Sequence, residues 1–238
     1  SQRYIGEVMA TRRDEVFLAT KTHDRTRDGS LQLLEQSLES LQTDHLDLWQ
    51  LHNIRRAEQL DQIFADDGAI HALLQAREEG IVKNLGITGH EDPDVLMDGL
   101  NRFDFDAILL ALNPADRFHR PFMDQLLPLA NEKGLGVIAM KIPARGRIFR
   151  DGGLTSMREA LTWTFSQPIS TVIVGCDDVA QLEENIAAAA EFKPLNSAQM
   201  AAIEAKVSDY PLEASFFKRG AAGFNQPDGQ EDDQQMDA

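Results

Sequence analysis

The fold is decided by a stretch that begins with the apolar run Val16-Phe-Leu-Ala-Thr20 and ends with Leu46-Asp-Leu-Trp-Gln-Leu51. Between these runs, Ser30–Leu41 repeats its apolar residues at helical spacing behind a serine, a residue type that suits a helix N-terminus. Two short apolar runs that flank an amphipathic helix are typical of parallel strands joined by a crossover helix. The stretch therefore predicts a βαβ unit.

The same alternation continues along the chain. Further strands are expected at Val82–Thr88, Ala107–Leu112, Gly136–Met140 and Thr171–Val174. Helices are expected at Arg3–Arg12, Asp67–Glu79, Pro93–Leu100, Pro121–Lys133, Ser156–Ser166, Val179–Ala189 and Ala198–Ser208. Such alternation implies an α/β fold with a parallel sheet, either a closed barrel or an open doubly wound sheet. A leading helix without its strand favours a (β/α)8 TIM barrel represented by about six βα units. A complete six-stranded open sheet is the alternative.

Composition limits the classes of partner. The net charge of −16 argues against nucleic acid, because phosphate binding needs a basic surface. Cys176 is the single cysteine, which excludes an internal disulfide and a cluster of thiolate metal ligands. No apolar stretch of about 18 residues is present, so no membrane span is expected. We expect a cytoplasmic protein with residues 1–220 in one partial barrel and a disordered acidic tail over residues 221–238. The oligomeric state is left open.

Polar residues follow several of the predicted strands. Chemistry in parallel βα folds gathers at the C-terminal ends of strands, where Lys21 and His52 follow two neighbouring apolar runs. A lysine there supplies fixed positive charge, and a histidine supplies a donor that can polarise a carbonyl group. Taken singly, either residue could instead be an ordinary loop residue. Other polar or small residues at strand ends are Thr88, His90, Asn113, Lys141, Gly175 and Cys176.

Two other signals have simpler structural explanations, and a third is left open. The run His90-Glu-Asp-Pro-Asp94 resembles a metal cluster, but Asp92 before Pro93 is an ordinary helix N-cap, and no metal is expected. Tyr4 and Val8 share a helix face and are expected in the core. Arg145-Gly-Arg147 follows a strand end and could hold phosphates or form a solvated loop.

Five blocks of the chain resemble, in order, segments of the aldo-keto reductase family. Together they cover residues 1–190, and their order makes the open sheet an unfavourable alternative. The blocks are Ser1–Glu7 with Arg13–Lys21, Asp44–His52, Gly80–Thr88, Lys133–Lys141, and Thr171–Gly175 with Leu182–Asn185.

The resemblance implies a (β/α)8 oxidoreductase that uses NAD(P)H to reduce aldehyde or ketone carbonyls of small molecules to alcohols, or the reverse. The family's catalytic tetrad is Asp, Tyr, Lys and His, and Lys21 and His52 match its last two members. The first block resembles the segment that follows the catalytic tyrosine. The Asp and Tyr are therefore expected upstream of Ser1, together with the first two βα units.

The resemblance also implies a set of cofactor-binding positions. These are Thr88, Met140, Lys141, Arg145, Gly175, Cys176, Gln181, Glu184 and Asn185. Several depart from the family pattern: Thr88-Gly89 stands in place of Ser-Asn, Leu109 in place of a glutamine, and Gly175-Cys176 and Gln181 in place of residues that include two cations. The missing cations weaken the case for NADP(H), whose 2′-phosphate needs Arg or Lys. A non-catalytic barrel that binds a nucleotide or a protein partner is the alternative function.

Overall fold

The computed structural model describes residues 1–219, so the expected tail over 221–238 lies outside the described residues. The chain forms two compact units. Unit 1 comprises Ser1–Gly89 and Val95–Ile108, and unit 2 comprises His90–Asp94 and the described residues from Leu109 onward. The strands follow one another in sequence order, β1-β2-β3-β4-β5-β6. Sequential order is that of a (β/α) barrel, whereas a doubly wound sheet reverses direction at a switch point. The predicted fold class is confirmed.

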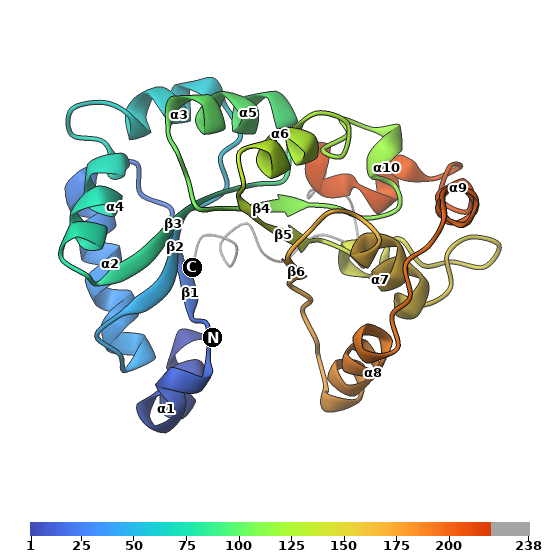
Figure 1. Cartoon of the computed structure of the whole chain (residues 1–238), viewed down its shortest axis with the longest axis horizontal. Helices are drawn as coiled ribbons and strands as arrows, with labels where there is room; N and C mark the ends of the chain where they lie inside the picture. Colours follow the sequence, from blue (N-terminus) through green and yellow to red (C-terminus); the bar gives the residue numbers. More distant parts are fainter. Residues whose placement is uncertain (220–238) are drawn as a thin grey trace. The chain divides into compact units, whose positions relative to one another are not determined.

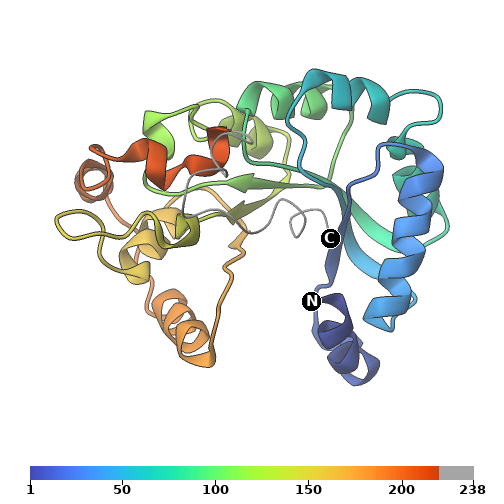
Figure 2. The same ribbon diagram turned by 180° about the vertical axis from the view of Figure 1, so that it is seen from behind.

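Unit 1 is a three-stranded parallel sheet with helices on one side of it. Its elements are α1 (Gln2–Arg12), η1 (Arg13–Glu15), β1 (Ala19–Thr22), α2 (Arg27–Leu41), β2 (Leu46–Leu51), α3 (Ala57–Ile63), α4 (Ala69–Glu78), β3 (Val82–Gly89) and most of α5 (Pro93–Arg102). Figures 1 and 2 show α2 and α4 on the same side of these strands. Every residue of β2 is buried, as expected for the central strand of a parallel sheet.

A buried carboxylate links the N-terminal ends of the strands of this sheet. Asp47 accepts hydrogen bonds from Arg13 Nη2 (2.9 Å), the Leu18 backbone amide (2.9 Å) and Lys83 Nζ (2.8 Å). Burial alone would raise the pKa of Asp47, but these three donors outweigh it and lower the pKa to about 2. Asp47 thereby joins the start of β2 to the segment before β1 and to the start of β3.

Unit 2 contains the rest of the sheet and its helices. Its elements are the end of β4 (Ala107–Ala111), η2 (Asp116–Phe118), α6 (Leu126–Glu132), β5 (Gly136–Met140), η3 (Ala144–Gly146), α7 (Met157–Phe165), β6 (Thr171–Val172), α8 (Val179–Ala190), α9 (Ser197–Ala205), α10 (Pro211–Ala214) and η4 (Phe216–Arg219). Trp163, Phe122 and Phe216 are among its largest fully buried side chains. The buried Glu204 accepts hydrogen bonds from Trp163 Nε1 (3.1 Å) and pairs with Arg117 Nε (2.9 Å), so α9 is fixed to α7 and η2.

The structure corrects several expected element boundaries. The first strand covers Ala19–Thr22, because Arg13–Glu15 forms a 3-10 turn and leaves Val16 and Phe17 exposed. Lys21 therefore lies within β1 instead of after it. The helix expected from Pro121 begins only at Leu126, and the last strand ends at Val172.

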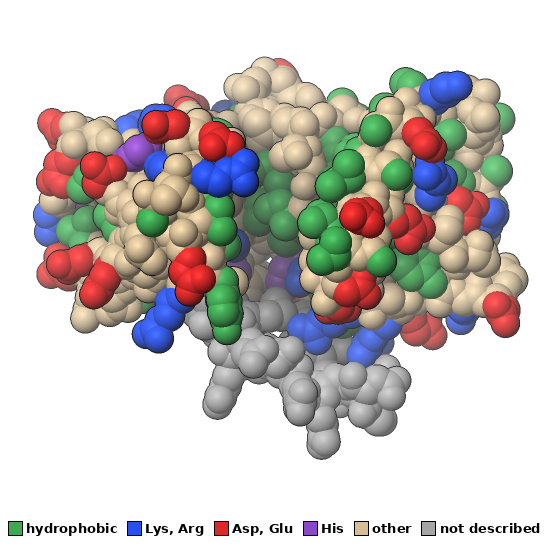
Figure 3. All heavy atoms as spheres, turned by 90° about the horizontal axis from the view of Figure 1, so that it is seen from below, with side chains coloured by type: hydrophobic (Ala, Val, Ile, Leu, Met, Phe, Trp, Pro, Cys, Tyr) green, Lys and Arg blue, Asp and Glu red, His purple; other side chains and the backbone are tan. Residues whose placement is uncertain are grey.

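The expectation that Tyr4 and Val8 belong to the core is wrong. Their exposed fractions are 78% and 45%, and α1 buries only Gly6 and Met9. On unit 2, Val179, Leu182 and Ile186 of α8 are likewise exposed. Figure 3 shows hydrophobic side chains that reach the surface of each unit. None of the described helices is long and apolar enough to cross a membrane.

Candidate active site

The two predicted catalytic residues belong to neighbouring strands of unit 1 in different ways, since Lys21 lies within β1 and His52 directly follows β2. Lys21 of β1 is in register with Gln50 of β2, and the His52 amide donates to the Thr22 carbonyl (2.8 Å). Side chains alternate between the faces of a strand, so Lys21, Gln50 and His52 share one face. Thr22 points to the other face, where its hydroxyl donates to Ser30 Oγ of α2 (3.0 Å). The sheet thus brings Lys21 and His52 to the face that α2 and α4 leave uncovered.

The environment of Lys21 is less aqueous than that of an ordinary surface lysine. Lys21 is an exposed residue. The protein around the ammonium group nevertheless excludes enough water to lower the pKa of Lys21 from its ordinary value. A partly desolvated ammonium group acts on neighbouring charges more strongly than one in bulk water.

The turn after β2 is held in a fixed conformation. Arg25 Nη2 donates to the His52 carbonyl (2.8 Å), and Asn53 adopts a left-handed backbone with φ 55°. The Asn53 amide donates to Thr88 Oγ1 (2.8 Å), so the Thr88 hydroxyl is bonded to this turn. The backbone at His52 is therefore fixed from both sides.

Gln50 is a polar residue of this face that the sequence analysis did not single out. Only 2% of it is exposed, and its side chain crosses Gly86, where an added Cβ would lie 2.8 Å from Gln50 Cγ. Its Nε2 has no hydrogen-bond partner among the described residues. A glutamine inside an apolar strand carries no distinguishing pattern, which is why sequence reasoning missed it.

Unit 2 contains a pocket of about 790 Å³. This volume lies within the range of about 300–1,000 Å³ typical of ligand and cofactor sites. Seven of the nine predicted cofactor positions line it: Met140, Lys141, Arg145, Gly175, Gln181, Glu184 and Asn185. Thr88 belongs to unit 1, and Cys176 lies beside the pocket, where its Sγ accepts a hydrogen bond from Asn185 Nδ2 (3.4 Å).

The remaining lining of the pocket is mainly apolar, and the sequence analysis did not predict it. Phe149 and Met157 come from the long connection after β5 and from the start of α7. Both residues are far from β6 in the sequence, so no local pattern groups them with the pocket residues that follow β6. Apolar walls beside a few polar groups suit a ligand with aromatic rings and a polar backbone.

At the N-terminus of α8, beside the pocket, backbone donors are already bonded to polar side chains of the chain. Asp178 is the N-cap of α8 and accepts from the Gln181 amide (2.8 Å), while Gln181 Oε1 accepts from the Asp177 amide (2.9 Å). These bonds satisfy two donors that an anion at the helix N-terminus would otherwise use. The carboxylates of Asp177, Asp178 and Glu184 add negative charge there.

The connection after β5 has an unusual backbone. Lys141, Ala144 and Arg145 have φ values of 64°, 49° and 55°, and Gly146 has φ 82°. Left-handed conformations at residues other than glycine cost about 1–3 kcal/mol and are common at functional sites. Lys141 and Arg145 are the two cations that line the pocket.

Neither tyrosine of the chain has the surroundings of a catalytic proton donor. Tyr4 lies on the exposed side of α1 in unit 1. The Tyr210 hydroxyl of unit 2 donates to the Ile148 carbonyl (2.8 Å) and accepts from the Leu154 amide (3.0 Å). The described residues also contain no group of three or more His, Cys, Asp and Glu side chains arranged to hold a metal, and Asp92 accepts from the Asp94 amide (3.0 Å), as expected of an N-cap.

Comparison with known proteins identifies relatives. Residues 1–151 match the model of the aldo/keto reductase family. An uncharacterized oxidoreductase of Bacillus subtilis is 26% identical over 235 residues, covering 79% of this chain and 73% of the relative. L-galactose dehydrogenase of Arabidopsis thaliana is 27% identical over 238 residues, covering 84% and 72%. The solved structure of a Bacillus halodurans aldo-keto reductase in its holo form matches with a TM-score of 0.72 at 23% identity, covering 86% of this chain and 77% of that chain.

Proposed function

Because the chain belongs to the aldo/keto reductase family, we propose that it is an NAD(P)H-dependent oxidoreductase that reduces aldehyde or ketone carbonyls to alcohols, or catalyses the reverse. The observation that carries this proposal is the pocket of unit 2, because seven of the nine expected cofactor positions line it. Apolar walls suit the rings of a dinucleotide, and Lys141 and Arg145 suit its phosphates.

The proposal assigns distinct roles to the cofactor and to the two candidate catalytic residues. A bound nicotinamide dinucleotide would supply the hydride for the carbonyl carbon. His52 donates a hydrogen bond that orients the carbonyl oxygen of the substrate, and Lys21 provides positive charge that favours the developing alkoxide. The lowered pKa of Lys21, which burial of the ammonium group causes, supports this role.

Binding of the dinucleotide is tested by titrating the 238-residue chain with NADH in a calorimeter. Arg145→Ala removes a cation from the pocket, and Arg158→Ala is the matched control, since Arg158 pairs with Glu191 (2.7 Å) outside the pocket. We expect Arg145→Ala to raise the Kd for NADH about tenfold, which is the usual contribution of a charge-assisted hydrogen bond. Arg158→Ala should leave Kd unchanged. Equal affinities for both variants and the parent chain would contradict the assignment of the pocket.

A second candidate function is a non-catalytic barrel that binds a nucleotide without turnover. The positions of the two tyrosines favour it, because Tyr4 is exposed on α1 and the Tyr210 hydroxyl is bonded to its own unit. Tight NADH binding without oxidation of NADH by a panel of aldehydes, in a longer form that contains the tyrosine expected upstream of Ser1, would support this candidate over the reductase.

A further inference from the structure

The strained connection after β5, residues 141–149, needs outside support to keep its shape. Three of its residues other than glycine have positive φ. Its internal hydrogen bonds are short-range turns, such as Ala144 N to Lys141 O (3.0 Å) and Arg147 N to Ala144 O (3.1 Å). Such turns do not offset several left-handed residues, so the conformation persists only where surrounding groups fix it. We call residues 141–149 the pocket loop.

One support is a buried amide that joins the pocket loop to the C-terminal segment Tyr210–Lys218. Asn113, 1% exposed, donates from Nδ2 to the Lys141 carbonyl (3.2 Å) and to the Ala214 carbonyl of α10 (3.0 Å). Its Oδ1 accepts from the Ala115 amide (2.9 Å), which fixes the orientation of the carboxamide. Asn113 thus holds the strained residue Lys141 and the C-terminal segment together.

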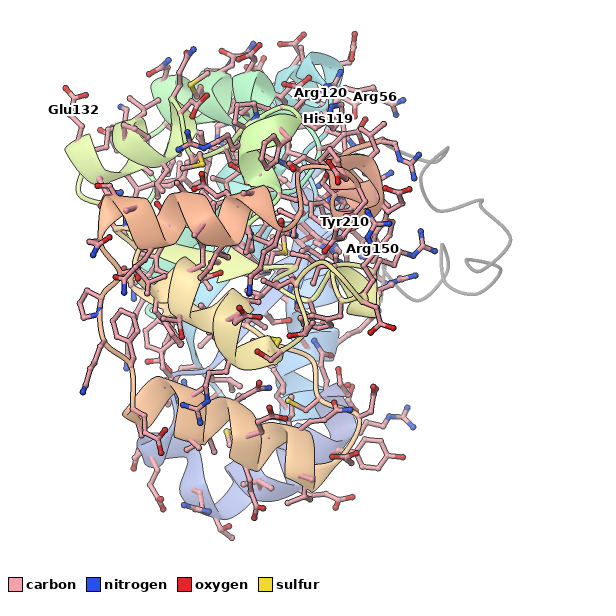
Figure 4. All side chains as sticks on the ribbon, turned by 90° about the vertical axis from the view of Figure 1, so that its right-hand side faces the viewer. Arg56, His119, Arg120, Glu132, Arg150 and Tyr210 are labelled. Atoms are coloured by element: carbon pink, nitrogen blue, oxygen red, sulfur yellow. The ribbon has the colours of Figure 1, made fainter. Side chains whose placement is uncertain are left out.

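Aromatic rings of the C-terminal segment provide the second support. The guanidinium carbons of Arg147 and Arg145 lie 4.4 Å and 5.8 Å from the centroid of the buried Phe216 ring. The Tyr210 hydroxyl is bonded to the Ile148 carbonyl of the pocket loop, and Arg150 lies 3.2 Å from the centroid of the Tyr210 ring. Figure 4 shows Arg150 and Tyr210 next to each other.

The C-terminal segment is itself anchored. The ammonium group of Lys218 pairs with the Asp116 carboxylate, and both side chains are almost fully buried. Lys218 Nζ also donates to the carbonyls of His119 and Arg120 (3.0 Å each). Breaking a buried pair of this kind leaves an uncompensated charge, so the segment has a strong preference for this position.

We propose that the C-terminal segment Tyr210–Lys218 positions the pocket loop, with Phe216 and Asn113 as positioning residues that set where Lys141 and Arg145 stand in the pocket. Coupling between two sites is reciprocal, so a ligand that needs this shape of the loop also stabilises the segment. The proposal rests on the proposed function in taking a dinucleotide as the pocket's ligand.

The sharpest test is Arg147→Met in the 238-residue chain, because Arg147 touches Phe216 without lining the pocket. If only direct contacts matter, NADH affinity is unchanged. If the loop is positioned through Phe216, Kd rises by about fivefold, the usual worth of a cation–π contact. Arg158→Met is the matched control and should leave Kd within about twofold. Phe216→Leu is a second variant with the same expected direction, and Phe192→Leu, which loses the ring pair with Phe165, is its control.

Hydrogen exchange separates failure of this inference from failure of the proposed function. Arg147→Met should speed exchange of the loop amides at Ala144, Gly146 and Phe149 with or without ligand, and saturating NADH should slow exchange across Tyr210–Lys218 of the parent chain. A parent chain that binds no NADH would refute the proposed function, while faster loop exchange in the variant would still support positioning. Unchanged loop exchange in both Arg147→Met and Phe216→Leu would overturn the inference.

Discussion

At the scale of single residues, Lys21 and His52 can be tested by kinetics. In a form of the protein that turns over an aldehyde, His52→Ala and Lys21→Met should each lower kcat/KM by about 10²-fold, a loss of about 2.7 kcal/mol in transition-state stabilisation. The reason is that each supplies charge or a hydrogen bond to the carbonyl oxygen as it becomes an alkoxide. His45→Ala is a suitable control, because His45 pairs with Asp44 (2.7 Å) away from this face.

Stability measurements distinguish a catalytic role from a structural one. A structural His52 would lower the melting temperature on substitution while folded protein kept near-normal turnover. A catalytic His52 would show the opposite pattern. Normal turnover in both variants would show that the assignment of Lys21 and His52 is wrong.

Asp47 makes a prediction about stability and pH. Its pKa is about 2 in the folded protein, against about 3.9 in an unfolded chain. The unfolded chain binds more protons between these values, so the stabilisation is fully present above about pH 4 and is lost as pH falls through about 2. Asp47→Asn should therefore cost about 2 kcal/mol at pH 7 in urea unfolding, and much less near pH 2. A difference between the two proteins that is independent of pH would contradict this account.

At the scale of elements, the sequence predicted what periodicity can reveal. The strands at Val82–Gly89 and Gly136–Met140 and the helix Met157–Phe165 agree closely with expectation, because apolar runs and helical spacing are strong over those lengths. The helices α3 and α10, with 7 and 4 residues, are too short to produce a period and were not predicted. The helix expected from Pro121 does not form in its first residues. There Asp116 accepts from the Phe122 and Met123 amides, and these bonds hold the segment out of a helix.

The candidate site was likewise predicted only in part. Polar residues at the ends of apolar runs suggested Lys21 and His52, and the family resemblance suggested seven of the residues that line the pocket. The fully buried Lys218 and its pairing with Asp116 were not predicted, since the two residues are far apart in the sequence. A long-range pair of this kind has no local sequence pattern.

The N-terminus of α8 carries a prediction about cofactor choice. Asp178 accepts from the Gln181 amide in the first turn of the helix, Gln181 Oε1 accepts from the Asp177 amide before the helix, and Asp177 adds a second carboxylate. A 2′-phosphate would meet negative charge there, so the chain should bind NAD(H) at least as tightly as NADP(H). Gln181→Arg should shift the ratio of the two Kd values toward NADP(H) by several-fold, and more at low salt. Calorimetry with both cofactors measures this ratio.

The chain offers a matched control for that substitution. Gln199 occupies the corresponding third position of α9, where it forms a capping box with Asn196 outside the pocket. Gln199→Arg adds the same charge at an equivalent helix position, so it should leave the ratio unchanged. A preference for NADPH of tenfold or more in the parent chain would show that other cations bind the phosphate.

At the scale of the whole molecule, reduction needs a hydride and a proton, and neither tyrosine of the chain stands where the family resemblance expects the proton donor. Tyr4 is 78% exposed on α1, and the Tyr210 hydroxyl bonds to the Ile148 carbonyl. We therefore expect the 238-residue chain to bind NADH but not to oxidise it with generic aldehydes at the rate of a complete reductase. Continuous assays that follow NADH absorbance over time check this directly. Turnover at typical enzyme rates, about 1–10³ per second, would require a donor that these assignments miss.

The last prediction concerns a longer form of the protein. If a tyrosine precedes Ser1, as the resemblance of the first block implies, that form should oxidise NADH with aldehydes, and Tyr→Phe at that position should abolish turnover while leaving NADH affinity unchanged. Lys21 lowers the pKa of a nearby phenol through its charge, and the phenol must be protonated to act as the donor, so the alkaline limb of the pH profile for reduction should shift upward in Lys21→Met. The 238-residue chain is the natural control, because its pocket lies within unit 2 and should bind NADH with similar affinity. A longer form that binds NADH as tightly but shows no turnover would instead favour the non-catalytic barrel.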